Sequence, residues 1–391
     1  MTTAPRPAPW GRIPGGRLAL LLLAGTGLVL GTVTGLARAG IGDGLGTAGV
    51  HGVVMTLGFL GTVIALERAI ALGTRWGYLG PLLSGLAVLL LPVAPVVGGV
   101  SLVLAGVVVV ATYAALLHRG HLDIHLVVMG VGGLAWVAAA VAWLGGIGPI
   151  RITPLLAAYL VLTIVGERLE LSRLTLPSAA SRRRFLAMVA VFVLGAAVAP
   201  WWRSGGLILG GIGLVAQVGW LARHDLARRT IHRPGIPRFA AICLLSAYAW
   251  MAVSGALWVA IGLGATGALL HDAMVHALFL GFVLSMVMGH APIIVPAILR
   301  TSLRFSRLAY APLVLLHGSV VVRIAADLAG SLPWREVALY GNITALVLFL
   351  VVTVRAVRRG RGDLTAGHLP PEPHATASPP GSHTTATGVP A

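Results

Sequence analysis

The sequence contains no lysine, a single cysteine and only 11 acidic residues among 391. The lone Cys243 cannot form an intrachain disulfide. No CxxC pair, glycine-rich phosphate loop, nucleophile elbow or metalloprotease helix motif is present, so nothing supports a nucleotide-driven pump or a hydrolase. Charged residues make up 10% of the chain and hydrophobic residues 57%. That composition is not typical of a soluble protein.

Long apolar runs dominate the chain instead. Runs of about 20 apolar residues are typical of helices that span a membrane. We expect an all-α, polytopic membrane bundle of about twelve transmembrane helices within residues 17–358, a cytoplasmic N-terminal tail over 1–16 and a disordered cytoplasmic tail over 359–391. The expected spans lie at about 17–38, 46–72, 77–95, 98–117, 124–144, 150–173, 185–202, 204–222, 238–263, 267–296, 306–328 and 336–357.

The placement of arginine predicts the orientation. Arginine supplies all 28 basic residues, and the net charge is +17. If loops alternate from a cytoplasmic N-terminus, 23 of the 28 arginines fall on the inner side and four on the outer side. This excess follows the positive-inside rule. We therefore expect a multi-pass protein of the inner (cytoplasmic) membrane with both termini in the cytoplasm. The lipid bilayer is its expected partner, and nucleic acid is not.

Two histidines lie inside well-separated spans, His51 in the second and His276 in the tenth. A histidine within a membrane helix is costly and indicates function by default. Counted from the outer ends of their spans, the two lie at depths of about 8 and 14 Å. They could hold a metal or a haem between them near the outer surface. The alternative is two packing histidines, each hydrogen-bonded to a backbone carbonyl.

Arginines near the outer surface suit a haem. Arg323 lies near the outer end of the eleventh span and Arg335 in the following outer loop. Haem propionates are anionic and pair well with such side chains, so we count both as cofactor-binding candidates. Alternatively, these arginines and the nearby tryptophans form an interfacial belt. Asp272, one helical turn before His276, is expected to orient His276 or to pair with Arg323.

The spans and the histidine-led strings resemble the catalytic subunit of haem-copper oxidases. In that family, histidines of the second and tenth spans hold a low-spin haem, which implies this role for His51 and His276. Met274 stands where the family places its high-spin haem ligand, and the sixth and seventh spans lack the copper-binding histidines. Oxidase-type copper is therefore unsupported, and the resemblance does not imply a terminal oxidase.

The chain is also similar to the NnrS family of haem-containing membrane proteins linked to nitric oxide and nitrosative stress. The similar strings are His51-x-x-x-Met55-x-x-Gly58-Phe59 and His276-Ala277-Leu278-x-x-Gly281. The resemblance implies one low-spin haem b, and a role in electron transfer or nitric oxide metabolism with a redox partner protein or nitric oxide. The first NnrS motif normally carries more histidines than are found here.

A polar layer is expected at the inner face, where Glu67-Arg68 and Glu167-Arg168 close the second and sixth spans. Adjacent residues on a helix point apart, so we expect pairs between helices, Glu67 with Arg168 and Glu167 with Arg68. His290, 14 residues beyond His276, falls near this layer. The layer is a structural clamp, a proton path or a second ligand site.

Other histidines are spare metal-ligand candidates. They are His290, His317 in the eleventh span and the string His118-x-x-His121-x-Asp123-x-His125 in a cytoplasmic loop. Two other function classes stay open. One is a secondary transporter or metal permease with a histidine site, which would favour broken helices and a midplane location. The other is a structural or assembly subunit without a cofactor.

Overall fold

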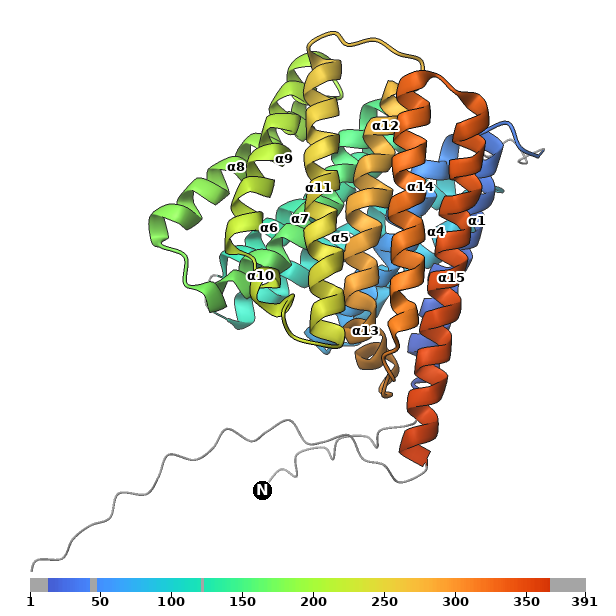
Figure 1. Ribbon diagram of the computed structural model, residues 1–391, viewed down its shortest axis with the longest axis vertical. Helices are drawn as coiled ribbons and strands as arrows, with labels where there is room; N and C mark the ends of the chain where they lie inside the picture. Colours follow the sequence, from blue (N-terminus) through green and yellow to red (C-terminus); the bar gives the residue numbers. More distant parts are fainter. Residues whose placement is uncertain (1–12, 43–47, 121–122, 366–391) are drawn as a thin grey trace, which may run out of the picture.

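A computed structural model describes residues 13–42, 48–120 and 123–365, which are helical with no strands among them (Figure 1). The α-helices are α1 (Gly15–Arg38), α2 (His51–Val53), α3 (Gly61–Leu72), α4 (Leu79–Leu90), α5 (Pro95–Arg119), α6 (Ile124–Leu144), α7 (Pro149–Leu171), α8 (Ala179–Val198), α9 (Arg203–His224), α10 (Ala227–Thr230), α11 (Ile236–Gly262), α12 (Leu270–His276), α13 (Ser285–Leu299), α14 (Tyr310–Ala329) and α15 (Leu332–Thr365). Two π-helical segments, η3 (Val54–Leu60) and η6 (Ala277–Leu284), join α2 to α3 and α12 to α13. Short 3₁₀ turns are η2 (Ala48–Val50), η4 (Trp76–Tyr78), η5 (Ser172–Thr175) and η7 (Arg307–Ala309).

Helices lie in every expected span as far as the structure describes it, and the all-helical fold is confirmed. In the described part of the chain, ten helices are long and apolar enough to cross a membrane. The helix over Trp76–Leu90 is apolar but shorter, and α8, whose first turns carry three arginines, is not among the ten. The last helix runs on to Thr365, beyond the expected end of its span at 357. The rest of the expected C-terminal tail and nearly all of the N-terminal tail lie outside the described residues.

The first and last described helices end together at one end of the bundle. Near the start of α1, Arg17 donates to the carbonyl of Ile298 at the end of α13, 3.2 Å away. Near the end of α15, the carbonyl of Gly360 accepts from Ser302, 2.6 Å away. We call this end the base and the opposite end, where α14 turns into α15, the apex; Figure 1 draws the base at the bottom. The chain therefore crosses the bundle an even number of times.

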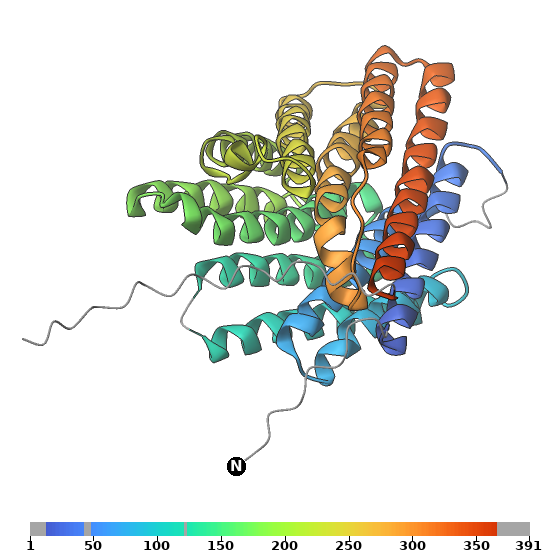
Figure 2. The same ribbon diagram turned by 60° about the horizontal axis from the view of Figure 1, so that its bottom comes forward.

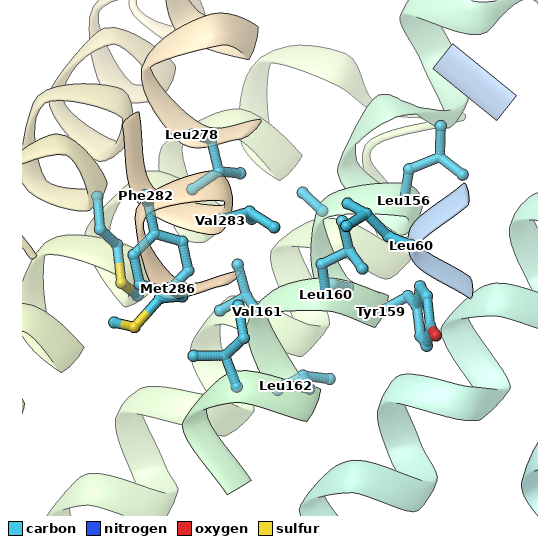
Figure 3. Close-up of a cluster of buried hydrophobic side chains, with 14 of the residues drawn as sticks. Leu60, Leu156, Tyr159, Leu160, Val161, Leu162, Leu278, Phe282, Val283 and Met286 are labelled. Atoms are coloured by element: carbon cyan, nitrogen blue, oxygen red, sulfur yellow. The ribbon is translucent and has the colours of Figure 1, made fainter. Parts of the chain in front are cut away.

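Helix α7 forms the centre of the core. Its apolar window is 83% buried, whereas those of the other candidate spans are 61% buried or less. Side chains of α7 such as Leu160 and Val161 fill the space between Leu60 of η3 and Phe282 of η6 (Figure 3). The two histidine-bearing segments thus pack on either side of one buried helix. Figure 2 shows α8 and α9 projecting to one side and α1 and α15 at the other.

Both expected functional histidines are followed by a π-helix. His51 begins α2 three residues before η3, and His276 is the last residue of α12, directly before η6. A π-helical turn inserts extra backbone into a helix and is frequent at functional sites. The two segments, far apart in sequence, therefore have the same local structure, in which a short α-helix with a histidine leads into a π-helix.

Candidate functional site

A cavity near the apex contains both histidines. Six parts of the chain line it, namely α1, α2 with η3, α7, α12 with η6, α14 and α15. It encloses about 1420 Å³ of empty space, counting its open mouth. The apolar part of its wall includes Met55, Phe59 and Leu280.

His51 is held by helix α1. Its Nδ1 lies 2.7 Å from the carbonyl oxygen of Gly31. A carbonyl only accepts, so Nδ1 carries the proton and Nε2 keeps a lone pair. Gly35 makes room for the ring, because a Cβ there would come 2.8 Å from the His51 Cε1 atom. Gly27 and Gly31, spaced four residues apart on the same face of α1, allow the same close approach, since a Cβ at either would press against Phe59 or Met55.

His276 is oriented by its own helix. Its Nδ1 lies 2.9 Å from the backbone oxygen of Asp272 and 3.3 Å from the carboxylate Oδ2 of Asp272. The same tautomer follows, with the lone pair on Nε2. Neither His51 Nε2 nor His276 Nε2 has a hydrogen-bonding partner among the residues that the structure describes. The two rings are close enough to interact electrostatically.

Asp272 also forms ion pairs with the two expected arginines, Arg323 and Arg335. Arg323 donates to Asp272 Oδ2 from Nη2 at 2.7 Å and from Nε at 3.2 Å. Arg335 lies 3.4 Å from the same oxygen, and Asp327 lies 3.2 Å from Arg335 and 3.9 Å from Arg323. Both expected contacts of Asp272, with His276 and with Arg323, are confirmed. Two carboxylates therefore neutralise these two arginines at the cavity wall.

Sequence reasoning missed one cation of the cavity. Arg38, at the end of α1, lines the wall and has no hydrogen-bond or ion-pair partner among the described residues. In the sequence, Arg38 is one of the four arginines expected on the outer side. The available signal was its position three residues after Gly35, at the end of the stripe formed by Gly27, Gly31 and Gly35, because that stripe contacts the His51 segment.

A family model described as Domain of unknown function (DUF8744) matches residues 17–358. The chain belongs to this family. No curated protein matches the chain, and no solved structure matches it either.

The base of the DUF8744 domain carries the expected polar layer with a different pairing. Arg68 bonds Glu167 at 3.2 Å, as expected. Arg68 also bonds its neighbour Glu67 at 2.5 Å, so the expectation that adjacent side chains point apart is wrong here. Both carboxylates share one guanidinium because each is largely buried and needs a cation.

Arg168 does not pair with Glu67. It bonds Nε2 of His290 at 2.6 Å, while His290 Nδ1 lies 2.6 Å from the carbonyl of Met286. His290 thus lies at the base, as expected, but both ring nitrogens are engaged. Binding a metal there would first require the contact with Arg168 to break.

His317 and the loop histidines also have partners. Nδ1 of His317 accepts from Trp250 at 2.7 Å, and Nε2 lies 3.0 Å from Ser246 Oγ. In the loop string, His125 lies 3.6 Å from Glu170, and His121 lies outside the described residues. Within the described residues no group of three or more histidine, cysteine or acidic side chains could hold a metal ion. Neither His290 nor His317 lines the cavity of the DUF8744 domain.

Proposed function

We propose that this DUF8744 member is an NnrS-like membrane protein that binds one low-spin haem b between His51 and His276, and that it acts in electron transfer or nitric oxide metabolism. One observation carries the proposal. Two imidazoles from distant segments, each with an Nε2 atom that has no partner among the described residues, line the same cavity. Neutral imidazole nitrogen is a natural axial ligand of haem iron.

The surroundings of both rings fit this ligand set. Axial histidines usually donate their second N–H to a carbonyl or carboxylate, which fixes the tautomer and raises the basicity of the ligand. Gly31 provides that acceptor for His51, and Asp272 provides it for His276. Packing histidines would also bond to carbonyls, but their Nε2 atoms would not need to share a cavity. When bound, the haem would supply a one-electron redox centre.

The cationic side chains divide into two roles. Arg38 has no partner among the described residues and is the side chain we assign to a haem propionate. Arg323 and Arg335 are already paired with Asp272 and Asp327. The charges of this cluster cancel, so it would attract a second propionate less strongly than Arg38 does. In this role the cluster orients His276 through Asp272 and closes the apex side of the cavity.

The proposed topology is twelve crossings in the inner membrane, in an arrangement like that of haem-copper oxidases, with both termini in the cytoplasm. Both described chain ends lie at the base, which fits an even number of crossings. Exposed tryptophans lie at both ends, as interfacial belts would require. Trp201, Trp202 and Trp334 are at the apex, and Trp76 follows α3 at the base. The base is the cytoplasmic side in this assignment.

Reduced-minus-oxidised spectra of the purified protein test the haem site. We expect sharp bands of a low-spin b haem in the wild type and their loss in both His51→Ala and His276→Ala. His232→Ala, at an exposed position of the base, is the matched control and should keep the bands. A colourless protein expressed with ample haem would contradict the proposal. Loss in only one of the two variants would show that the ligand pair is wrong.

The same sample separates electron transfer from nitric oxide chemistry. With both axial positions filled, nitric oxide can bind only after a histidine leaves. Slow or absent binding of nitric oxide to the reduced protein therefore favours electron transfer. Rapid binding that spectrally displaces one histidine favours nitric oxide chemistry.

A further inference from the structure

Two polar side chains of the cavity wall have no part in the proposed haem attachment. Asn342 of α15 is only 3% exposed; its Oδ1 lies 2.7 Å from Ser319 Oγ, and its Nδ2 has no partner. His271 of α12 has a buried Nδ1 that is also without a partner. Both residues line the cavity. Buried polar groups left without a partner are uncommon and call for an explanation such as a ligand.

The two side chains lie at different depths. The Arg323–Asp272 ion pair brings α14 and α12 to the same level. Ser319, the partner of Asn342, is four residues deeper on α14, and His271 is one residue nearer the apex on α12. At 1.5 Å per residue, Asn342 and His271 are offset by about 8 Å along the helices. This offset suits a ligand that carries polar atoms at both ends of a small ring.

Apolar side chains also line the cavity. Phe59 of η3, Leu280 of η6 and Ile343 of α15 line the same cavity and are half-buried. Such a wall favours a flat apolar ring over a charged or strongly hydrated solute.

The cavity also lies next to the bilayer. Thr32 and Gly35 of α1 line one side of it and Leu339 of α15 lines another. Both helices are at the edge of the bundle (Figures 1 and 2). Val347 of α15 is exposed on the outer surface of the bundle, where a bilayer would contact it. A ligand dissolved in the membrane thus meets these two helices first.

From these features we infer that the cavity binds a lipid-soluble quinone or hydroquinone. One ring oxygen lies at Asn342, the other at His271, and the ring packs against Ile343, on the α15 side of the cavity. The free Nδ2 of Asn342 donates, and a ring oxygen accepts in both the quinone and the hydroquinone, while the His271 imidazole can donate or accept, so both redox forms can be held. The inference deepens the proposed function, on which it rests for the role of the ligand as electron donor. Binding itself requires no haem.

Calorimetric titration of the full-length protein in detergent with decylubiquinone tests the inference. We expect saturable binding of one molecule per chain. Asn342→Leu and His271→Phe should each raise the Kd by about tenfold, the loss of one hydrogen bond to a buried group. Thr344→Val, two residues from Asn342 on the exposed face of α15, should leave the Kd unchanged. Decan-1-ol, which has the chain without the ring, should not displace the quinone.

Three results would overturn the inference. They are uptake no greater than that of empty micelles, equal displacement by decan-1-ol, and an unchanged Kd in the folded variants. If Asn342→Leu fails to fold, His271→Phe alone decides. The haem spectrum of the same samples is read separately. Haem bands without quinone binding reject only this inference, whereas quinone binding to a colourless protein rejects only the haem proposal.

Discussion

Gly35 of α1 lies directly against the imidazole of His51, where an added Cβ would come 2.8 Å from ring Cε1. The same helix supplies the carbonyl of Gly31 that fixes the His51 tautomer. Helix α1 therefore both makes space for the ring and orients it, although it contributes no ligand. The position of His51 depends on the absence of a side chain one span away.

Gly35→Ala should accordingly lower the haem content. The added methyl group pushes the His51 ring out of line with His276, while it favours the helix itself. Haem per protein, measured by absorbance of the purified variant, reports the effect. Gly25→Ala is the control, because a Cβ at Gly25 meets nothing within 4 Å. Equal haem content in the two variants would show that His51 does not depend on Gly35.

Arg38→Gln should lower the midpoint potential of the haem. A cation near the iron disfavours the more positive ferric state, so its removal stabilises that state. Redox titration followed at the haem bands measures the shift. Arg151→Gln removes an exposed arginine that does not line the cavity, and it should shift the potential less. Identical potentials in both variants would argue against Arg38 as a propionate partner.

Asp272→Ala should destabilise the apex. It leaves Arg323 without its closest partner and Arg335 with Asp327 alone. Removing one partner from a buried ion pair costs about 3 kcal/mol, so the melting temperature should fall. Glu336→Ala, at an exposed position of α15 beside this cluster, should change it little. Melting curves that coincide would mean that the cluster does not stabilise the fold.

At the base, Arg68→Met should cost more stability than Glu67→Gln. Arg68 serves both Glu67 and Glu167, so its loss leaves two largely buried carboxylates unpaired. Loss of Glu67 leaves the pair between Arg68 and Glu167 intact. Thermal unfolding ranks the two variants, and both should retain their haem bands if the layer is a structural clamp. Haem loss in a variant that stays folded would point to a direct role of the base at the haem.

The sequence predicted the helices well because apolar runs of membrane length have few alternatives. It did not predict η3 or η6. In spans that are apolar nearly all round, such as Ala277–Leu284, hydrophobic periodicity carries no information on the type of helical turn. In the sequence, only the histidines His51 and His276 therefore indicated that these two segments are functional.

Ion pairs could be predicted from the sequence in two situations. Either the two residues are four apart on one helix, or both lie at the same end of neighbouring spans. Asp272 and His276, four residues apart, were found together, and so were Arg68 and Glu167. The partner of Arg168 could not be predicted, because it depends on how deep α13 places His290. Asn342 was missed for a similar reason. A lone asparagine in an apolar span gives no indication of which helix it faces.

The measurement closest to the central claim is the electron paramagnetic resonance spectrum of the oxidised purified protein, taken with its haem-to-protein ratio. Two imidazole ligands give a low-spin ferric haem, so we expect a low-spin signal at one haem per chain. In His276→Ala, any haem that remains should become high-spin. A high-spin signal in the wild type, or a protein without haem, would contradict the assignment of His51 and His276 as an axial pair.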